Sequence, residues 1–575
     1  MRPFRFSPAL PQTPAFTIGD GLILLGFATL LYAGTRLAFH VPAVLAGPDI
    51  SPSPLALPWY ALLSVGRMAA AYVLSMLFSL FYGYAAARNR TARMVLMPLL
   101  DVLQSVPILS FLPVVLLSLT AILPKHLAAE LAAIVLIFTS QAWNITFSFY
   151  QSMTTIPSEL SEAAAVFRLG PWARFKTLEP PFAAIGLLWN SMMSWSGGWF
   201  FLMAAEIFKV GTRDFRLPGL GSYLQTAANQ GDLSAVFWGL STLVLVILLL
   251  DQLVWRPLPA WTEKFKLQMV EREEPMTSWF LDSFSNAWLV KQFDTRVWKP
   301  FSEWIDSHMQ RPLGSHIAVP ERTSHNERPS GVAIAFALGF ALLVSYGGYR
   351  AAGVFVKLPA SAWWQLGIGT GATFLRVSGS LVIALLWTVP LGVAIGTNRR
   401  WAAVLQPIVQ VVAAIPATAL FPVVLLVLLQ APGGLNLAAV ALMLMGTQWY
   451  LLFNVIAGAA AIPQDLRDTT ELLRLSRIDR WRTLILPALF PYIVTGAITA
   501  SGGAWNASII AEHVEFGGQT HFVTGVGALI SKATGTGDYP LLLAATLALV
   551  ITVILINRTF WLRLYRLAEA RYHMD

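Results

Sequence analysis

The sequence predicts an all-α integral membrane protein with about twelve transmembrane helices, arranged as two parallel repeats of about six. Three observations lead to this fold class. The composition is too apolar for a chain whose whole surface faces water, apolar runs of bilayer length recur along it, and its two halves repeat each other in register.

The composition excludes an ordinary soluble chain. Of the 575 residues, 56% are hydrophobic and only 12% are charged, and the mean hydropathy is +0.62. Soluble domains carry more charge, about a quarter of their residues, because their surfaces face water. A soluble enzyme with a large core would not need apolar runs that are long enough to cross a bilayer.

Such runs occur in two sets, one on either side of a polar interval. A helix rises about 1.5 Å per residue, so roughly 20 residues cross a hydrocarbon core of about 30 Å. No small-residue cleavage motif follows the first run, which we therefore interpret as a span and not as a signal peptide. The runs are Leu22–Ala38, Tyr60–Ala86, Val95–Leu123, Ala129–Phe149, Ile185–Ile207, Ala235–Trp255, Val332–Tyr349, Leu366–Ile395, Val404–Leu429, Leu435–Phe453, Pro487–Ile510 and Leu541–Trp561.

The net charge of +9 is concentrated in short loops on one side of the predicted bundle. Short loops rich in Lys and Arg stay in the cytoplasm. This places both termini, the central interval and these loops inside, with Arg213 and Arg216 as exceptions on the outer side. The basic groups are Arg88, Arg90 and Arg93; Arg168, Arg174 and Lys176; Arg399 and Arg400; and Arg474, Arg477, Arg480 and Arg482.

The sequence lacks the residues that several kinds of functional site require. The chain has no cysteine, which excludes disulfides, thiolate metal sites and cysteine catalysis. Its eight histidines form no cluster with metal-ligand spacing, so no metal site is predicted. No Ser/His/Asp set indicates catalysis, and the basic residues are too dispersed for nucleic acid.

The two halves match without a gap at an offset of 306 over a long stretch. Ile156-Pro157 pairs with Ile462-Pro463, and upstream the offset becomes 309. An even number of spans in each half makes the repeats parallel, related by an axis along the membrane normal. A pathway on that axis is the natural functional site, and a duplicated bundle without a pore is the alternative. The predicted domains are 1–255, the linker 256–330 and 331–575; further matched pairs are Trp199/Trp505, Glu206/Glu512, Arg67/Arg376 and Gly83/Gly392.

The linker 256–330 balances its charges and is rich in aromatic residues. The spacing of Phe280, Phe284 and Trp288 puts aromatic side chains on one face of a helix. Such a helix suits the lipid headgroup layer, which we favour, or the surface of a partner.

The loops 156–181 and 462–487 follow equivalent spans. In each, Ile-Pro is followed by acidic residues, which is typical of a helix start because proline suits the first turn and carboxylates complement the helix dipole. A later proline opens the next span. A short helix in the cytoplasm, once in each half, could transmit the motion of a partner to the membrane helices.

These loops resemble the EAA loop of the permeases of binding-protein-dependent ABC importers. The first copy has Glu162-Ala163-Ala164 and later Leu178 and Pro181 at the spacing of the motif. The second is degenerate, with Asp468-Thr469-Thr470, but retains Leu484 and Pro487. Arg168 and Arg474 stand where the general motif has glycine, a departure that bears on the turn within the loop.

Further stretches resemble the nitrate/sulfonate/taurine/bicarbonate type of permease. The most specific are Pro390–Gly396, and Glu206 and Glu512, each of which precedes a Gly-x-Gly. The resemblance covers both halves and leaves out the linker. It implies the type I ABC importer permease fold in a bacterial inner membrane, and two cytoplasmic ABC ATPase subunits. It also implies a solute-binding protein, periplasmic or lipid-anchored.

The resemblance also implies which residues contact the ATPases. No Gly-x-x-x-x-Gly-Lys-Ser/Thr loop occurs in the chain, so ATP and Mg²⁺ would be bound by the partner subunits and no cofactor by this chain. The chain is therefore expected to be a transport permease and not an enzyme. The expected coupling residues are Glu159, Glu162, Ala163, Ala164, Arg168, Asp465, Asp468, Thr469, Thr470 and Arg474.

Glycine pairs in the fifth and eleventh spans mark a candidate substrate pathway. They permit a bend or a close approach of backbones within a membrane helix, and packing of helices through small residues is the alternative. The acidic pair near the outer ends of these spans could line a gate or be hydrated at the interface. The candidates are Ser196, Gly197, Trp199, Glu206, Gly502, Gly503, Trp505, Asn506 and Glu512.

Arg67 and Arg376 are predicted near the outer face, where they could attract anions, although a snorkelling position is favoured. We expect a fused permease that imports a small polar solute by alternating access, with small anions such as nitrate, sulfonates or bicarbonate as the class of cargo. Related carriers also take neutral or cationic heterocycles, so the sequence does not fix the solute. The alternatives are an ion-coupled secondary transporter and a membrane-embedded enzyme. The better-conserved motif of the first loop suggests that it couples more strongly than the second.

Overall fold

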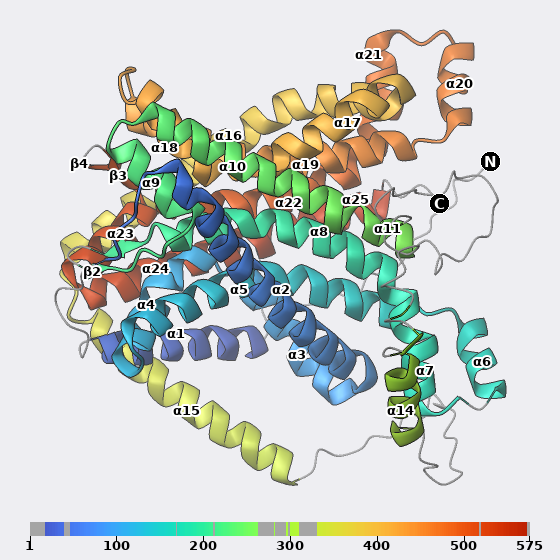
Figure 1. The fold of residues 1–575 in the computed structure, drawn as a ribbon, viewed down its shortest axis with the longest axis horizontal. Helices are drawn as coiled ribbons and strands as arrows, with labels where there is room; N and C mark the ends of the chain where they lie inside the picture. The colour runs from blue at the N-terminus through green and yellow to red at the C-terminus, as the bar shows by residue number, and fades with distance from the viewer. Residues whose placement is uncertain are drawn as a thin grey trace, which may run out of the picture.

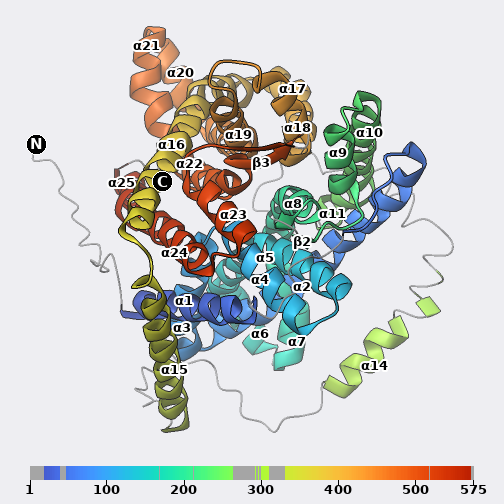
Figure 2. The ribbon, with the colours of Figure 1, turned by 90° about the vertical axis from the view of Figure 1, so that its left-hand side faces the viewer.

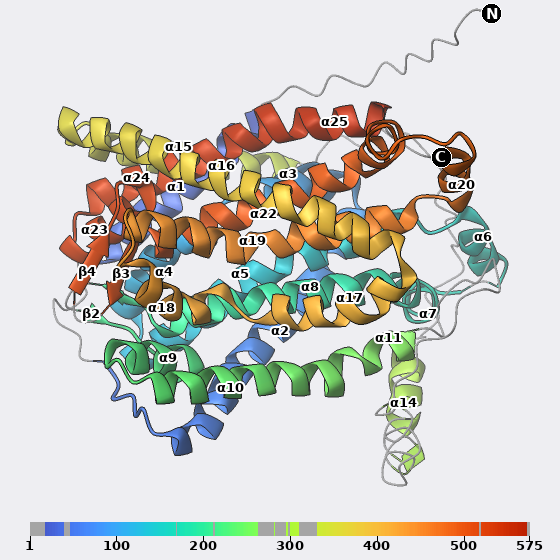
Figure 3. The same ribbon diagram turned by 90° about the horizontal axis from the view of Figure 1, so that it is seen from above.

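The computed structural model describes residues 18–38, 47–167, 169–210, 213–262, 299–309, 331–516 and 519–571, and residues 281, 292, 295 and 296. Long helices run side by side along the horizontal axis of Figure 1. Four short strands, β1 to β4, lie at one end of this bundle, which we call the hairpin end. The short helices α6 and α20 protrude from the other end, which we call the short-helix end (Figures 1 and 3).

The first half contains most of the long helices expected from hydropathy. Each begins and ends within a few residues of an apolar run. The elements are α1 Ile18–Ala38, a short 3-10 turn Pro54–Ala56, α2 Leu57–Arg88, α3 Arg90–Ser105, α4 Ile108–Ile122, α5 Lys125–Thr154, α6 Ser158–Val166, α7 Pro171–Thr177, α8 Glu179–Glu206, β1 Lys209–Val210, β2 Arg213–Asp214, α9 Leu220–Asn229, α10 Leu233–Leu250, a π-helical turn Asp251–Trp255 and α11 Pro257–Thr262.

Among the described residues, the second half repeats this order after a helix of the linker. Its elements are α14 Lys299–Met309 from the linker, then α15 Gly331–Phe355, α16 Ala360–Thr397, α17 Arg399–Ala414, α18 Ala417–Leu428, α19 Gly434–Ala461, α20 Gln464–Leu472, α21 Arg477–Arg480, a π-helical turn Trp481–Ile485, α22 Leu486–Ala511, β3 His513–Phe516, β4 Gln519–Phe522, α23 Val526–Thr536, α24 Tyr539–Ile556, a π-helical turn Asn557–Trp561 and α25 Leu562–Arg571.

Within the described residues, seven helices are long and apolar enough to cross a membrane, or up to nine if each of two bent pairs counts as one span. The bent pairs correct the sequence prediction, which took Val95–Leu123 and Val404–Leu429 as continuous. The chain turns by 99° between α3 and α4 and by 82° between α17 and α18. Val106 and Ile415 each precede a proline and are extended, because proline disfavours the helical conformation of the residue before it.

The two halves pack in the same way. Helix α5 lies between α2 and α8, as α19 lies between α16 and α22. The arm after each bend crosses to the other half, since α4 contacts α22, α23 and α24, whereas α18 contacts α8 and α9 (Figures 2 and 3). The repeated positions even make related hydrogen bonds. Leu109 N donates to Asn506 Oδ1 and Thr418 Oγ1 donates to Phe200 O, each over 3.4 Å.

The all-α prediction misses two small antiparallel hairpins. β1 pairs with β2 through Lys209 and Asp214, and β3 pairs with β4 through His513 and Phe522. Each hairpin joins a long helix, α8 or α22, to a short one, α9 or α23, that packs back against it. In the linker, the aromatic positions 280, 284 and 288 lie outside the described residues.

Candidate functional site

A cavity of about 950 Å³ lies between the two halves. Its first-half wall comes from α8 and the end of α10, and its second-half wall from α17, α19 and α22. At one extreme it is lined by Arg256, Gly396 and Ala460, near the short-helix ends of their helices. At the other it reaches Ala417 and Asn506. The cavity therefore extends from the short-helix end deep into the bundle.

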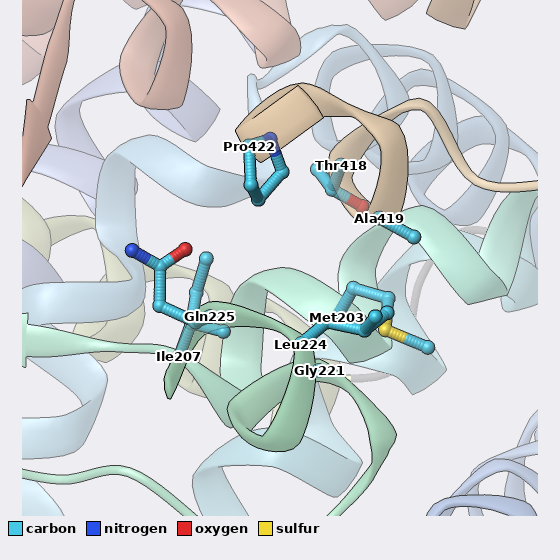
Figure 4. Close-up of a pocket in the computed structure, with 8 residues that line it drawn as sticks. All are labelled: Met203, Ile207, Gly221, Leu224, Gln225, Thr418, Ala419 and Pro422. Atoms are coloured by element: carbon cyan, nitrogen blue, oxygen red, sulfur yellow. The ribbon is translucent and has the colours of Figure 1, made fainter. Parts of the chain in front are cut away.

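Toward the hairpin end the two halves fit closely. Figure 4 shows the crevice between α18 and the helices α8 and α9, where Thr418 and Pro422 face Met203 and Gln225. Its volume is only about 10 Å³, which holds no more than about one water molecule. This contact lies on the hairpin side of the large cavity.

The two walls of the cavity differ in chemistry. The first half contributes aromatic rings from α8, including Trp189, Trp199 and Phe200. The second half contributes amides and a phenol: Gln406 and Gln410, one helical turn apart on α17, and Tyr450 and Asn454, one turn apart on α19. These four residues are not among the pathway residues predicted from the sequence, although polar side chains four residues apart in an apolar helix are a signal that could have found them.

Charge is scarce in the cavity. Among the described residues that line it, only Asp251 and Arg256 are charged, and Arg256 Nε lies 3.1 Å from Asp251 Oδ2. The two charges therefore largely offset each other. A solute in the cavity would meet neutral dipoles and aromatic faces, not an unpaired ion.

Two buried indoles lie in the cavity wall. The rings of Trp195 and Trp255 lie 5.5 Å apart between centroids, and both line the cavity. Within the described part of the chain, neither indole Nε1–H has an acceptor. An indole N–H can only donate, and a buried donor is costly to leave unpaired. Both Nε1 atoms are themselves buried, so the indoles present apolar ring atoms to the cavity and not their donors.

The structure brings five of the predicted pathway residues to this cavity and leaves four outside it. Helices α8 and α22 run unbroken through their glycine pairs. At Gly198 a side chain would meet the Gln141 amide at 2.7 Å, so there the glycine permits a close approach and not a bend. The lining residues are Ser196, Gly197, Trp199, Gly503 and Asn506, whereas Gly502, Trp505, Glu206 and Glu512 do not line it and Trp505 is buried in the core.

Glu206 is held in a hydrogen-bond network close to the hairpin end. Arg67 Nη1 donates to Glu206 Oε1 over 2.9 Å and to the carbonyl of Pro218, also over 2.9 Å. Ser64 Oγ donates to the same carboxylate oxygen over 2.6 Å. Arg67 also forms two bonds to Glu130. Neither the hydrated nor the gate-lining position expected for Glu206 matches this placement, because the carboxylate is fully buried.

Glu512 sits in the corresponding network of the second half. Arg376 Nη1 donates to Glu512 Oε1 over 2.7 Å, and Thr373 Oγ1 donates to it over 2.7 Å. Asn436 takes the place of Glu130 and accepts from Arg376. The favoured snorkelling position of the two arginines is therefore wrong. Arg67 is only 4% exposed, and both guanidinium groups are directed to buried carboxylates.

The Gly-x-Gly motif is part of these networks. Gly221 N donates to Glu206 Oε2 over 2.7 Å and Gly527 N donates to Glu512 Oε2 over 2.9 Å. A side chain at Gly219 or Gly525 would fall on the carboxylate itself. Close packing of the backbone on a buried acid therefore explains the glycines, and each network fixes a short helix, α9 or α23, to the bundle.

Arg213 and Arg216, the two arginines predicted on the outer side of the membrane, are also paired. Arg216 donates to Asp214 from Nε and Nη2, the latter over 2.7 Å, and Arg213 donates to Tyr539 over 3.3 Å. Burial raises the pKa of Asp214, but the hydrogen bonds and charge of Arg216 outweigh it and place the pKa below its ordinary value. The carboxylate is therefore ionised at neutral pH and offsets one of the charges at the hairpin end.

The coupling residues expected from the loops lie on the two protruding helices. Helix α6 carries Glu159 and Glu162, and α20 carries Asp465 and Asp468; all four side chains are exposed. Ala164 and Thr470 occupy the same position and are buried. Large apolar side chains are also exposed at these tips: Val166, Phe167, Leu472 and Leu473.

Arg474 preserves the turn that the general motif builds with glycine. Its φ is +48°, in the left-handed region, and it is the one described residue other than glycine with a positive φ. Leu475 N donates to Thr470 O and Arg474 N donates to Glu471 O, which are the two bonds of a Schellman motif. In the first loop Leu169 N makes the equivalent bond to Ala164 O, and Arg168 lies outside the described residues.

A buried acid distinguishes the first loop from the second. Glu179 is fully buried at the start of α8 and pairs with Arg88 from α2 and with Arg174 from α7. At the equivalent position the second half has Ile485. There Arg480, which corresponds to Arg174, lies 3.4 Å from the exposed Glu471. The helices around the first loop are thus tied together by a buried carboxylate and two partly exposed arginines, whereas the second half has isoleucine in place of that carboxylate.

The described residues contain no cluster of three or more His, Cys, Asp or Glu side chains that could hold a metal ion. Two repeated helical halves, interlocked around a cavity and each bearing one protruding helix, define a membrane transport protein of duplicated architecture. The chain belongs to the family described as the inner membrane component of binding-protein-dependent transport systems, which matches it twice, over residues 75–254 and 388–573. It is a non-catalytic permease, and the tandem match confirms the resemblance carried by the loops.

Several named permeases are similar in sequence to part of this chain. It is 29% identical over 195 residues to the nitrate import permease protein NrtB of Leptolyngbya laminosa, covering 34% of this chain and 65% of that protein. It is 32% identical over 176 residues to the bicarbonate transport system permease protein CmpB of Synechococcus elongatus, covering 31% and 59%. The taurine transport system permease protein TauC of Escherichia coli is 25% identical over 155 residues, covering 27% and 54%. Each match spans between about half and two thirds of the relative's own length.

Proposed function

We propose that this chain supplies both membrane halves of an ATP-driven importer and moves a small polar solute inward by alternating access. The observation that carries the proposal is the cavity between the halves, which reaches the same end of the bundle from which α6 and α20 protrude. One chain therefore contains both a candidate pathway and the two protruding helices that could transmit the motion of a partner to it. The proposal takes α1, α8 and α15 as spans in addition to the seven long helices and the two bent pairs, which would make twelve spans in two repeats.

In this proposal the short-helix end is cytoplasmic, with both termini inside. Exposed apolar side chains such as Phe167 and Leu472 beside exposed carboxylates suit insertion of α6 and α20 into clefts on two ATPase subunits. ATP and Mg²⁺ would be bound by those subunits. A solute-binding protein would deliver the cargo at the hairpin end, where α18 packs against α8 and α9.

We further propose a small oxyanion as the cargo, of the class that includes nitrate, sulfonates and bicarbonate. Relatives named for nitrate, bicarbonate and taurine support this class. So do the side-chain amides of Gln406 and Gln410 in the cavity wall, because their N–H groups can donate to the acceptor oxygens of an oxyanion. Without an unpaired cation the cavity would hold an anion weakly, which permits release after delivery.

Uptake into membrane vesicles tests the proposal. With the chain, its ATPases and its binding protein present, uptake of labelled nitrate, taurine or bicarbonate should stop on ATP depletion and survive an ionophore. Uptake that collapses with the ionophore and survives ATP depletion would establish an ion-coupled secondary transporter instead. ATP-dependent uptake of a neutral or cationic solute, with no oxyanion transported, would overturn the cargo class alone.

A further inference from the structure

The linker helix α14 contacts the segment next to the first protruding helix. Lys176 Nζ donates to Asp306 Oδ2 over 2.5 Å and to Ser302 Oγ over 2.9 Å. Trp172 Nε1 donates to the other oxygen of Asp306 over 3.0 Å. Both donors belong to α7, only a few residues after α6. One carboxylate of the linker therefore bridges two side chains of α7.

The opposite face of α14 is aromatic and exposed. Phe301 and Trp304 stack with ring centroids 6.2 Å apart and an angle of 13° between planes, and they are 50% and 57% exposed. At about 100° per residue, Phe301 and Trp304 share one face of the helix, while Ser302 and Asp306 share the other. The helix is thus amphipathic, with its polar face on α7.

The position of α14 matches the boundary of a membrane. In Figures 1 and 3 its axis runs across the direction of the long helices, at the level of α7, whereas α6 lies farther from the bundle. Rings of Trp and Phe on one face of a helix that lies across the spans are typical of the lipid headgroup layer. That layer covers an apolar face of this kind at a bundle end.

We propose that α14 is a membrane-surface strut, in which Phe301 and Trp304 lie in the lipid headgroup layer and Asp306 holds α7. Given the proposed function, the strut fixes the surroundings of one coupling helix to the membrane surface and leaves the other without such a support. In the second half, Ile478 and Arg482 occupy the positions of Trp172 and Lys176. The fused chain would therefore present its ATPases with two inequivalent docking sites.

The charge of Asp306 supports the contact. Hydrogen bonds from Lys176 and Trp172 place the pKa of this carboxyl below its ordinary value. It is therefore ionised at neutral pH, and the bridge to α7 would be lost only when the pH falls through that lowered pKa.

Spin labels test the lipid contact, because the chain has no cysteine and a single introduced cysteine is unique. The full chain, in nanodiscs of phosphatidylethanolamine and phosphatidylglycerol, would be labelled at Phe301→Cys, Trp304→Cys or, as control, Glu303→Cys. We expect the first two labels to be accessible to oxygen and shielded from a water-soluble nickel chelate, and the control to show the reverse. Equal exposure to the chelate at all three positions would overturn the proposal. So would labels at Phe301→Cys and Trp304→Cys that are shielded from the chelate only after ATPase is added, because a protein partner and not lipid would then cover the aromatic face.

Cross-linking tests the contact with α7. A short reagent with two thiol-reactive groups should join Lys176→Cys to Asp306→Cys but not Arg482→Cys, the equivalent position of the second half, to Asp306→Cys. Cross-links of equal yield, or none in the first pair, would overturn the bridge. Both measurements are made without ATP or cargo, so their failure would leave the proposed transport function standing, and a failure of transport would leave the strut standing.

Discussion

The guanidinium of Arg67 donates to the buried carboxylate of Glu206 over 2.9 Å, across 139 positions of sequence. Arg376 and Glu512 repeat the relationship over 2.7 Å in the second half. In both halves the acid also accepts a backbone N–H from the second glycine of a Gly-x-Gly. One ion pair per half thus joins a long helix, the helix beside it and the short helix of the hairpin end.

Removal of one charge from this pair should destabilise the protein strongly. Breaking a buried ion pair by changing one partner costs about 3–5 kcal/mol, because the other charge stays buried. We expect Glu206→Gln to lower the unfolding midpoint of the purified chain clearly in a thermal melt. Glu130→Gln is the control, because Glu130 contacts the same Arg67 but is 38% exposed and its loss should cost less than about 1 kcal/mol. Equal effects of the two variants would contradict this view of the network.

Glycine at position 474 should stabilise the second loop. Arg474 has a φ of +48°, and a left-handed conformation costs about 1–2 kcal/mol for a residue with a side chain. Arg474→Gly would relieve most of that cost, while Arg474→Val would increase it. Slower amide hydrogen exchange in residues 464–476 of the glycine variant, and faster exchange in the valine variant, are the expected results. The same rate in all three proteins would mean that the turn does not limit opening of the loop.

The amides of α17 should matter for transport and not for folding. Gln406 and Gln410 line the cavity on the wall opposite the aromatic side chains of α8. We expect Gln406→Leu with Gln410→Leu to reduce uptake by about fivefold to 150-fold, because each lost hydrogen bond to a solute contributes about 0.5–1.5 kcal/mol and about 1.4 kcal/mol is a factor of ten. Val404→Leu is the control, since Val404 is exposed on α17 and does not line the cavity. Normal uptake by the double variant, with normal membrane insertion, would place the pathway elsewhere.

The two coupling loops should respond unequally to a reversed charge. The first is supported by the buried Glu179 with its two arginines and by the contact of α14 with Lys176, and the second has neither. We expect Glu162→Arg to reduce ATP-dependent uptake several times more than Asp468→Arg. Equal losses would show that the asymmetry of the loops has no effect on coupling.

Much of this architecture could be predicted from the sequence, because it depends on local patterns. Apolar length identified the long helices, and the offset of 306 matched Glu206 to Glu512 before any contact was known. The bends at Pro107 and Pro416 were missed, since each proline lies inside an apolar run whose length alone suits one span. The sequence pointed to both the arginines and the acids of the buried networks but gave no reason to join them.

The cavity wall was harder to predict, because it forms only when the two halves interlock. Ser196 and Trp199 were found from one helix, but Gln410 and Asn454 come from helices that meet α8 across the repeat axis. Trp505 illustrates the limit of symmetry. Trp505 and its counterpart Trp199 are both only 1% exposed, but Trp199 lines the cavity and Trp505 does not.

The central claim is that α6 and α20 dock two ATPase subunits, and co-purification from the native membrane tests it most directly. The tagged chain should recover a nucleotide-binding subunit and ATPase activity, and Glu162→Arg with Asp468→Arg should release both while the chain stays in the membrane. Recovery of the chain alone, or an ATPase that remains bound to the double variant, would contradict the account.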